Sequence, residues 1–109
     1  MKPGTKADAE KPRWELLPLS IIEGAVKVFG AGAVKYTDHG WQTVPRAPER
    51  YFAALMRHLT RWQAGERFDP EDGLPHLDHA LCDLIIMAWH DRRGWTEKQK
   101  TKTSKYING

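Results

Sequence analysis

The 109-residue sequence has little cysteine and no long apolar run. Its single cysteine, Cys82, stands within an apolar stretch, which excludes a disulfide framework and favours a reducing, cytoplasmic setting. No apolar run approaches the roughly 20 residues that a membrane span needs, and the polar start of the chain does not resemble a signal peptide. We therefore expect a single-domain cytoplasmic protein with no membrane partner.

Acidic residues are scarce at both ends of the chain and abundant between them. Residues 1–13 carry a net charge of +2 and residues 92–109 one of +5, whereas residues 14–91 carry −4. A nucleic-acid-binding domain would instead carry its basic residues through the folded part, so we do not expect a nucleic-acid partner. This distribution predicts a flexible segment over 1–13, a folded domain over 14–94 and a basic, flexible tail over 95–109.

Strand-like alternation is also missing, and apolar residues recur at helical spacing. We predict helices over about 20–35, 48–64 and 75–94. Ser20 and Glu23 have the spacing of a capping box, Gly65 fits a C-cap, and Pro75 opens the third helix. The expected fold class is all-α, a small bundle of three to four helices.

The third helix is apolar on more than one side. Its predicted core stripe consists of Leu77, Leu81, Leu84, Ile85 and Ala88, and further apolar surface comes from Ile86, Met87 and Trp89. Two partner helices cannot cover a helix that is apolar most of the way round. The sequence therefore predicts a homo-oligomer, a dimer or larger, that completes the bundle.

Polar residues form lines on the second and third helices. His76, His79, Asp83 and His90 share one face of the third helix, and His58, Trp62 and Glu66 follow one face of the second. Because a short connection makes the two helices antiparallel neighbours, the two lines can face each other.

Six acidic residues against one arginine fall within residues 66–83. Such a density repels itself unless cations compensate, and oxygen ligands suit magnesium or manganese, with imidazole favouring manganese or a more nitrogen-preferring ion. The candidate metal ligands are Glu66, Asp69, His79 and Asp83. A solvated acidic turn with hydrogen-bonded histidines remains the alternative.

Basic and aromatic side chains supply candidates for nucleotide binding, namely Lys35, Tyr36, Trp41, Arg57, Arg61 and Trp62. The stretch "FGAGAVKY" is not a phosphate-binding P-loop because it lacks the third glycine, the preceding strand and the Gly-Lys-Ser/Thr ending. Lys35 is equally explained by the helix dipole, and Trp41 by a cover over the core. Cys82 is expected to be buried rather than nucleophilic.

The segments "KPRWELLP", "FGAGAVKY", "RHLTRWQAGE" and "DPEDGLPHLDHA" together resemble the phage and prophage dATP/dGTP diphosphohydrolases, which are grouped with the MazG-like all-alpha nucleotide pyrophosphatases. The resemblance covers about residues 11–89. It implies conversion of a deoxynucleoside triphosphate to monophosphate and pyrophosphate, in the host cytoplasm if the chain is phage-encoded. The motifs Glu-Glu-x-x-Glu and Glu-x-x-Asp of the MazG-like enzymes are not matched here, because histidines stand among the acidic residues at the corresponding places.

The leading hypothesis is metal-dependent hydrolysis of a purine (deoxy)nucleoside triphosphate. A Mg²⁺ or Mn²⁺ ion would neutralise phosphate charge and lower the pKa of the attacking water. Glu66 and Asp83 would hold it with help from His79, and His58 or His76 would act as base. The missing glutamate pairs motivate an alternative, a non-catalytic module that sequesters a nucleotide. A helical oligomer without any nucleotide is the third possibility.

Overall fold

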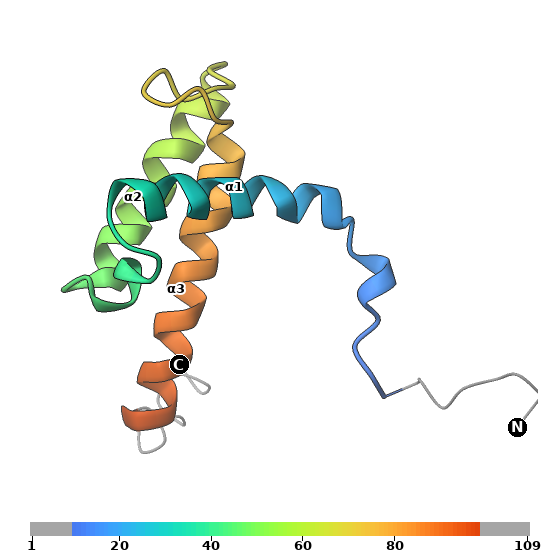
Figure 1. The fold of residues 1–109 in the computed structure, drawn as a ribbon, viewed down its shortest axis with the longest axis vertical. Coiled ribbons are helices and arrows are strands. Elements are labelled where there is room, and N and C mark those ends of the chain that lie inside the picture. The colour runs from blue at the N-terminus through green and yellow to red at the C-terminus, as the bar shows by residue number, and fades with distance from the viewer. Residues whose placement is uncertain (1–9, 99–109) are drawn as a thin grey trace, which may run out of the picture.

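The computed structural model describes residues 10–98, which form three α-helices and two short 3-10 turns (Figure 1). The turns are η1 (Trp14–Leu16) and η2 (Gly40–Thr43), and the helices are α1 (Leu19–Lys35), α2 (Ala47–Gln63) and α3 (His76–Lys98). The described part of the chain has no named strand, and an isolated bridge joins Phe68 to Pro75. The predicted all-α class is confirmed. None of the described helices combines the length and apolar character needed to cross a membrane.

The helices α2 and α3 form an antiparallel hairpin, and α1 lies across it with its N-terminal end projecting beyond the pair (Figure 1). The most extensive packing is between α2 and α3, as the short connection predicted. The crossing of α1 over α3 is close, because a Cβ at Gly24 would collide with the carboxylate of Asp78. Glycine therefore permits this approach.

A small core lies where α1 crosses α3. Ala25, Cys82 and Ile86 are buried there, and the partly buried side chains packed around them are Val28, Phe29, Trp41, Tyr51 and Leu81. Trp41 meets Phe29 and Trp89 edge to face, with ring centroids 5.8 and 5.0 Å apart. Trp41 thus covers the core, one of its two predicted roles.

The predicted capping box at Ser20 and the predicted end of the third helix were wrong. Ser20 lies inside α1, which begins at Leu19 after Pro18, and no side chain caps its N-terminus. The helix α3 continues through Gly94 to Lys98, four residues into the predicted tail, because a single glycine costs only about 1 kcal/mol in a helix. The rest of that tail, 99–109, and most of the predicted N-terminal segment, 1–9, lie outside the described residues.

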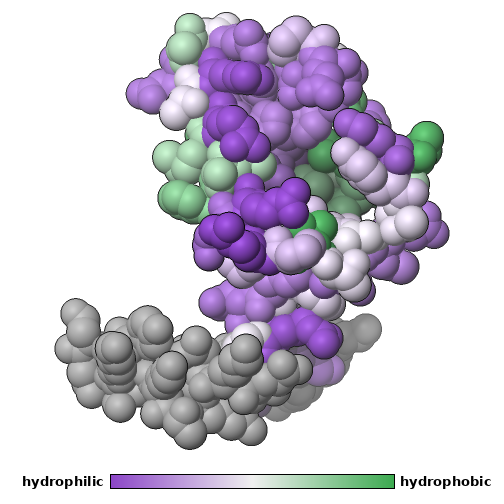
Figure 2. All heavy atoms as spheres, turned by 90° about the vertical axis from the view of Figure 1, so that its left-hand side faces the viewer, coloured by the Kyte–Doolittle hydropathy of each residue, from purple (hydrophilic) through white to green (hydrophobic). Residues whose placement is uncertain are grey.

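Most of the predicted core stripe of α3 is exposed, although Leu81 packs against the core as predicted. Ile86 is buried at 3 % exposure, whereas Leu77, Leu84 and Ile85, assigned to the core stripe, are 43 %, 51 % and 38 % exposed. The cause is the position of α1, which covers the Cys82–Ile86 side of α3. The surface turned toward the viewer in Figure 2 is mostly hydrophilic, with apolar areas between the polar side chains.

Candidate functional site

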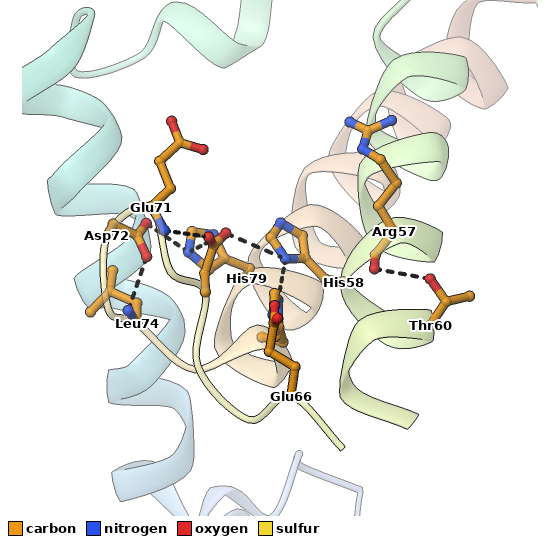
Figure 3. Close-up of polar contacts among 10 residues, drawn as sticks. Arg57, His58, Thr60, Glu66, Glu71, Asp72, Leu74 and His79 are labelled. Carbon is orange, nitrogen blue, oxygen red and sulfur yellow. Dashed lines mark hydrogen bonds and ion pairs between the residues drawn. The ribbon is translucent and has the colours of Figure 1, made fainter. Parts of the chain in front are cut away.

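Three histidines from α2 and α3 meet carboxylates of the connecting loop (Figure 3). His58 belongs to α2, and His76 and His79 lie in the first turn of α3. Asp69 and Asp72 belong to the loop between the two helices. The two polar lines predicted from the sequence therefore face each other at the closed end of the hairpin.

The end of α2 sets the position of Glu66. The N–H of Gly65 donates to the carbonyl of Trp62 and the N–H of Glu66 to that of Arg61, both at 3.0 Å, which is the Schellman pattern. Gly65 has φ +104°, a conformation that L side chains rarely adopt. The "QAGE" sequence thus ends the helix and turns Glu66 toward α3.

The loop then folds back on itself around Asp69. Its N–H donates to the carbonyl of Leu74 at 2.8 Å, and its own carbonyl accepts from the N–H of Gly73 at 2.7 Å. Asp69 Oδ1 accepts from the N–H of Glu71, and Asp72 Oδ1 accepts from that of Leu74, each at 2.9 Å. These side-chain turns hold Asp69, which is only 6 % exposed, against the histidines.

The donor atoms of the cluster are close together. Nδ1 of His58 lies 2.9 Å from Nδ1 of His76, whose Nε2 donates to Glu66 Oε1 at 2.6 Å. Asp69 Oδ2 lies 3.9 Å from Nδ1 of His58 and 4.0 Å from Nε2 of His79. Nε2 of His79 is 2.8 Å from Asp72 Oδ2, yet it lacks a partner in hydrogen-bond geometry. Such a set of nitrogen and oxygen donors fits a divalent cation.

Burial and the neighbouring imidazole keep His58 neutral. Its ring stacks on that of His79, with centroids 4.5 Å apart and planes 5° from parallel. Burial and the nearby His79 lower the pKa of His58 to about 4, although Asp69 opposes the shift. A neutral ring keeps a nitrogen lone pair, which a metal ligand needs.

Beside this cluster a cavity of about 650 Å³ opens between α1, η2, α2 and α3. Aromatic and apolar side chains, among them Phe29, Tyr36 and Trp41, form much of its wall. Arg50 and Arg57 supply positive charge from α2. The size and lining are typical of small-molecule sites.

Asp83 lies on α3, one turn beyond His79, and lines the cavity. It is 8 % exposed, and its Oδ2 has no hydrogen-bond partner among the described residues. Burial raises the pKa of its carboxyl to about 7, against the opposing influence of His79 and Arg57. Its neighbour Cys82 is buried, as predicted, and burial raises the pKa of the thiol to about 12. A buried carboxyl without a partner that faces a cavity is a feature of functional sites.

The remaining predicted residues separate into two groups. Tyr36, Trp41 and Arg57 line the cavity. Lys35, Arg61 and Trp62 are not among its lining residues. Lys35 lies 3.9 Å from Glu71 on the surface, and Arg61 and Trp62 receive the Schellman hydrogen bonds through their carbonyls.

The other member of the predicted α3 line, His90, lies far along the helix. Its Nε2 donates to the carbonyl of Trp41 at 3.0 Å and so fixes the loop that carries this tryptophan. His90 therefore supports the wall of the cavity and does not join the cluster.

Sequence reasoning missed three residues of this region. Asp72 was counted only as one of the acidic residues, and Arg50 and Tyr51 were not singled out. Tyr51 precedes His58 by two helical turns, so the spacing that placed the histidine also indicated the tyrosine. Burial, together with the nearby Asp83, raises the pKa of Tyr51.

Residues 1–101 match the family model described as dATP/dGTP diphosphohydrolase, N-terminal. Searches of curated proteins and of solved structures found no significant match. The match spans nearly all of the chain and includes every helix, the cluster and the cavity. The chain therefore belongs to the dATP/dGTP diphosphohydrolase N-terminal family.

Proposed function

We propose that the chain is a metal-dependent diphosphohydrolase that converts a purine deoxynucleoside triphosphate to its monophosphate and pyrophosphate. The family description supports the activity and the class of substrate. One structural observation carries the proposal: two residues one turn apart on α3 serve the cavity and the cluster, since Asp83 lines the cavity, whereas His79, which acts on the Asp83 carboxyl, belongs to the His/Asp cluster. A ligand in the cavity would therefore have its charged end beside the cation ligands.

The cavity offers separate surfaces for the two ends of a nucleotide. Tyr36 and Trp41 suit the flat face of a purine, and Arg50 and Arg57 suit phosphate oxygens. In Figure 3 the side chain of Arg57 points away from Glu66 and the connecting loop. A divalent ion, when bound by the His/Asp cluster, would neutralise phosphate charge.

Hydrolysis requires a group that removes a proton from water. A water oxygen bonds to the α-phosphorus, the bond from this phosphorus to the bridging oxygen breaks, and pyrophosphate leaves with that electron pair. The pKa of Asp83, about 7, suits a general base near neutral pH, whereas that of His58, about 4, makes its imidazole a weak base. We therefore assign the role of proton acceptor to Asp83. Glu66 orients His76 by accepting the hydrogen of its Nε2.

The test is pyrophosphate release from each of the four deoxynucleoside triphosphates, with Mg²⁺ or Mn²⁺ and with chelator. We expect turnover of purine substrates, a loss of at least 100-fold in Asp83→Asn, and a raised KM in Arg57→Gln. Arg13→Gln is the matched control because Arg13 is exposed and pairs with Glu15 before α1. No release from any nucleotide with either ion would contradict the proposal.

A sequestering module is the second candidate, because histidines stand among the acids of the cluster. This alternative predicts that nucleotide binds tightly with EDTA present and is recovered intact after denaturation. Recovery of monophosphate and pyrophosphate would instead support the hydrolase.

A further inference from the structure

The donor atoms between α2 and α3 fall into two sets that share one carboxylate. His58, Asp69 and His76 form the first set, and Asp69, Asp72 and His79 form the second. Within each set the donor atoms lie within 4.8 Å of one another. Two ligands of one cation, each roughly 2.0–2.2 Å from it, lie about 3–4 Å apart, so each set has the dimensions of one cation position.

Within the first set, Glu66 fixes the tautomer of His76. A carboxylate only accepts, so Nε2 of His76, 2.6 Å from Glu66 Oε1, carries the hydrogen and Nδ1 carries a lone pair. Nδ1 of His76, which carries this lone pair, lies 2.9 Å from Nδ1 of His58. The side chain of His76 is fully buried. A carboxylate that receives the second N–H of a histidine is the usual outer partner of a metal-binding imidazole.

Asp69 stands between the two sets with one oxygen uncommitted. Its Oδ1 accepts from the N–H of Glu71, whereas its Oδ2 lies 3.9 Å from His58 and 4.0 Å from His79. These distances are too long for hydrogen bonds but suit an oxygen that shares a cation with each imidazole. One carboxylate can thus serve both positions.

The second set contains an unmet buried nitrogen. Nε2 of His79 is inaccessible, and its contact with Asp72 Oδ2, 2.8 Å away, does not have hydrogen-bond geometry among the described residues. A cation between His79, Asp72 and Asp69 would satisfy this nitrogen.

We propose that these residues form a two-cation centre bridged by Asp69, in which the two positions differ in preference. The first position, with two imidazoles and one carboxylate, selects a nitrogen-preferring ion such as Zn²⁺ or Co²⁺. The second position, with one imidazole and two carboxylates, accepts a harder ion such as Mn²⁺. The role of this centre in catalysis rests on the proposed function, whereas its existence is measurable without nucleotide.

The test is titration of chelator-treated full-length protein with Co²⁺, followed by visible absorption and calorimetry. We expect two equivalents to bind, the tighter one with the visible band of a nitrogen-containing site, and Mg²⁺ to compete at least tenfold more weakly for the tighter position. His58→Gln should remove the tighter equivalent, Asp72→Asn the weaker, and Asp69→Asn should weaken both at least tenfold. Glu66→Gln should weaken the first position by about 10- to 100-fold.

His39→Gln and Asp91→Asn are the matched controls, because both residues are exposed and lie outside the two sets. They should bind two equivalents. Circular dichroism checks that each variant remains helical, and a variant that unfolds is replaced by His76→Gln or Asp69→Ser.

Three outcomes would overturn the inference. The first is a protein that binds no Co²⁺, the second is a single bound equivalent that Asp72→Asn leaves unchanged, and the third is Mg²⁺ binding as tight as that of Co²⁺. Two equivalents without pyrophosphate release would support the centre and contradict the proposed function. Turnover with Mg²⁺ by protein that binds no Co²⁺ would overturn the centre alone.

Discussion

At the scale of single residues, the buried carboxyl of Asp83 makes the stability of the fold depend on pH. Its pKa of about 7 exceeds the ordinary value of 3.8 because burial disfavours the charged form. The folded chain therefore holds this proton more tightly than the unfolded chain. The free energy of unfolding therefore falls as pH rises from about 4 through 7, because the carboxyl ionises more readily in the unfolded chain.

Asp83→Asn should thus stabilise the metal-free protein at neutral and higher pH, because the amide has nearly the same shape and no charge. The gain in unfolding free energy should be roughly 2–3 kcal/mol larger at pH 8 than at pH 5. Urea denaturation of both proteins in the presence of chelator measures this difference. His79 and Arg57 face the same carboxyl, and a gain that does not change with pH would show that they compensate its charge fully.

Residue types and spacing predicted much of the cluster. Periodicity placed His58 and His79 on facing helices, and the density of acids drew attention to Asp69. The sequence did not distinguish Asp72, which lies beside His79, from Glu71, because the loop's hydrogen bonds decide which carboxylate turns inward. For Asp83, spacing predicted the face of α3 but not the cavity, which depends on the crossing of α1.

At the scale of elements, the end of α2 is the turn on which the cluster depends. Gly65→Ala should destabilise the protein by about 1–2 kcal/mol, because alanine is strained at φ +104°. Thermal denaturation checks the loss. Gly30→Ala is the control, since nothing lies within 4 Å of a Cβ at this position of α1 and alanine favours a helix. It should raise stability by up to about 1 kcal/mol, and equal effects of the two changes would contradict our description of the turn.

The crossing of α1 over α3 makes a second prediction. Gly24→Ala should force the carboxylate of Asp78 to move, because the new methyl group collides with it, and this cost should offset most of the roughly 1 kcal/mol that alanine contributes in a helix. In an Asp78→Ala background the same change should be stabilising. A double-mutant cycle in urea measures this coupling, and independent effects would mean that the two helices are not in close contact.

Element boundaries were only partly predictable. Proline and glycine signals located the start of α2 within one residue and the left-handed turn at Gly65 after its C-cap, because proline fixes φ and glycine readily adopts a positive φ. The capping box at Ser20 failed because Pro18 precedes α1 and the helix begins before the serine. Gly94 did not end α3, since glycine stops a helix only where a left-handed turn follows.

At the scale of the whole molecule, a stripe of α3 remains uncovered in the single chain. Leu77, Leu84 and Ala88 share one face at helical spacing, with Ile85 beside it, and all four are exposed. We propose that a second copy of the chain covers this stripe, in place of the Ile86–Trp89 side that the sequence indicated. Burying such side chains contributes about 1.5–3 kcal/mol each.

The pair of changes Leu84→Glu and Ile85→Glu should therefore give a folded monomer. Light scattering at several concentrations measures the mass, and circular dichroism checks the helices. Lys27→Glu together with Glu23→Lys, which exchanges charges on the exposed surface of α1, should leave the mass unchanged. A wild-type chain that is monomeric at every concentration would contradict the proposal.

The distribution of the site along the chain affects how the protein can vary. All five residues of the His/Asp cluster lie within 58–79, so the proposed cation ligands form one short block of the sequence. The cavity wall draws instead on segments from Val28 to Ile86, including helix α1 and the loop that carries Trp41. Substitutions before residue 58 can therefore reshape the ligand cavity without touching a single donor. Relatives of this chain should accordingly diverge in the ligand they prefer sooner than in the ions they hold.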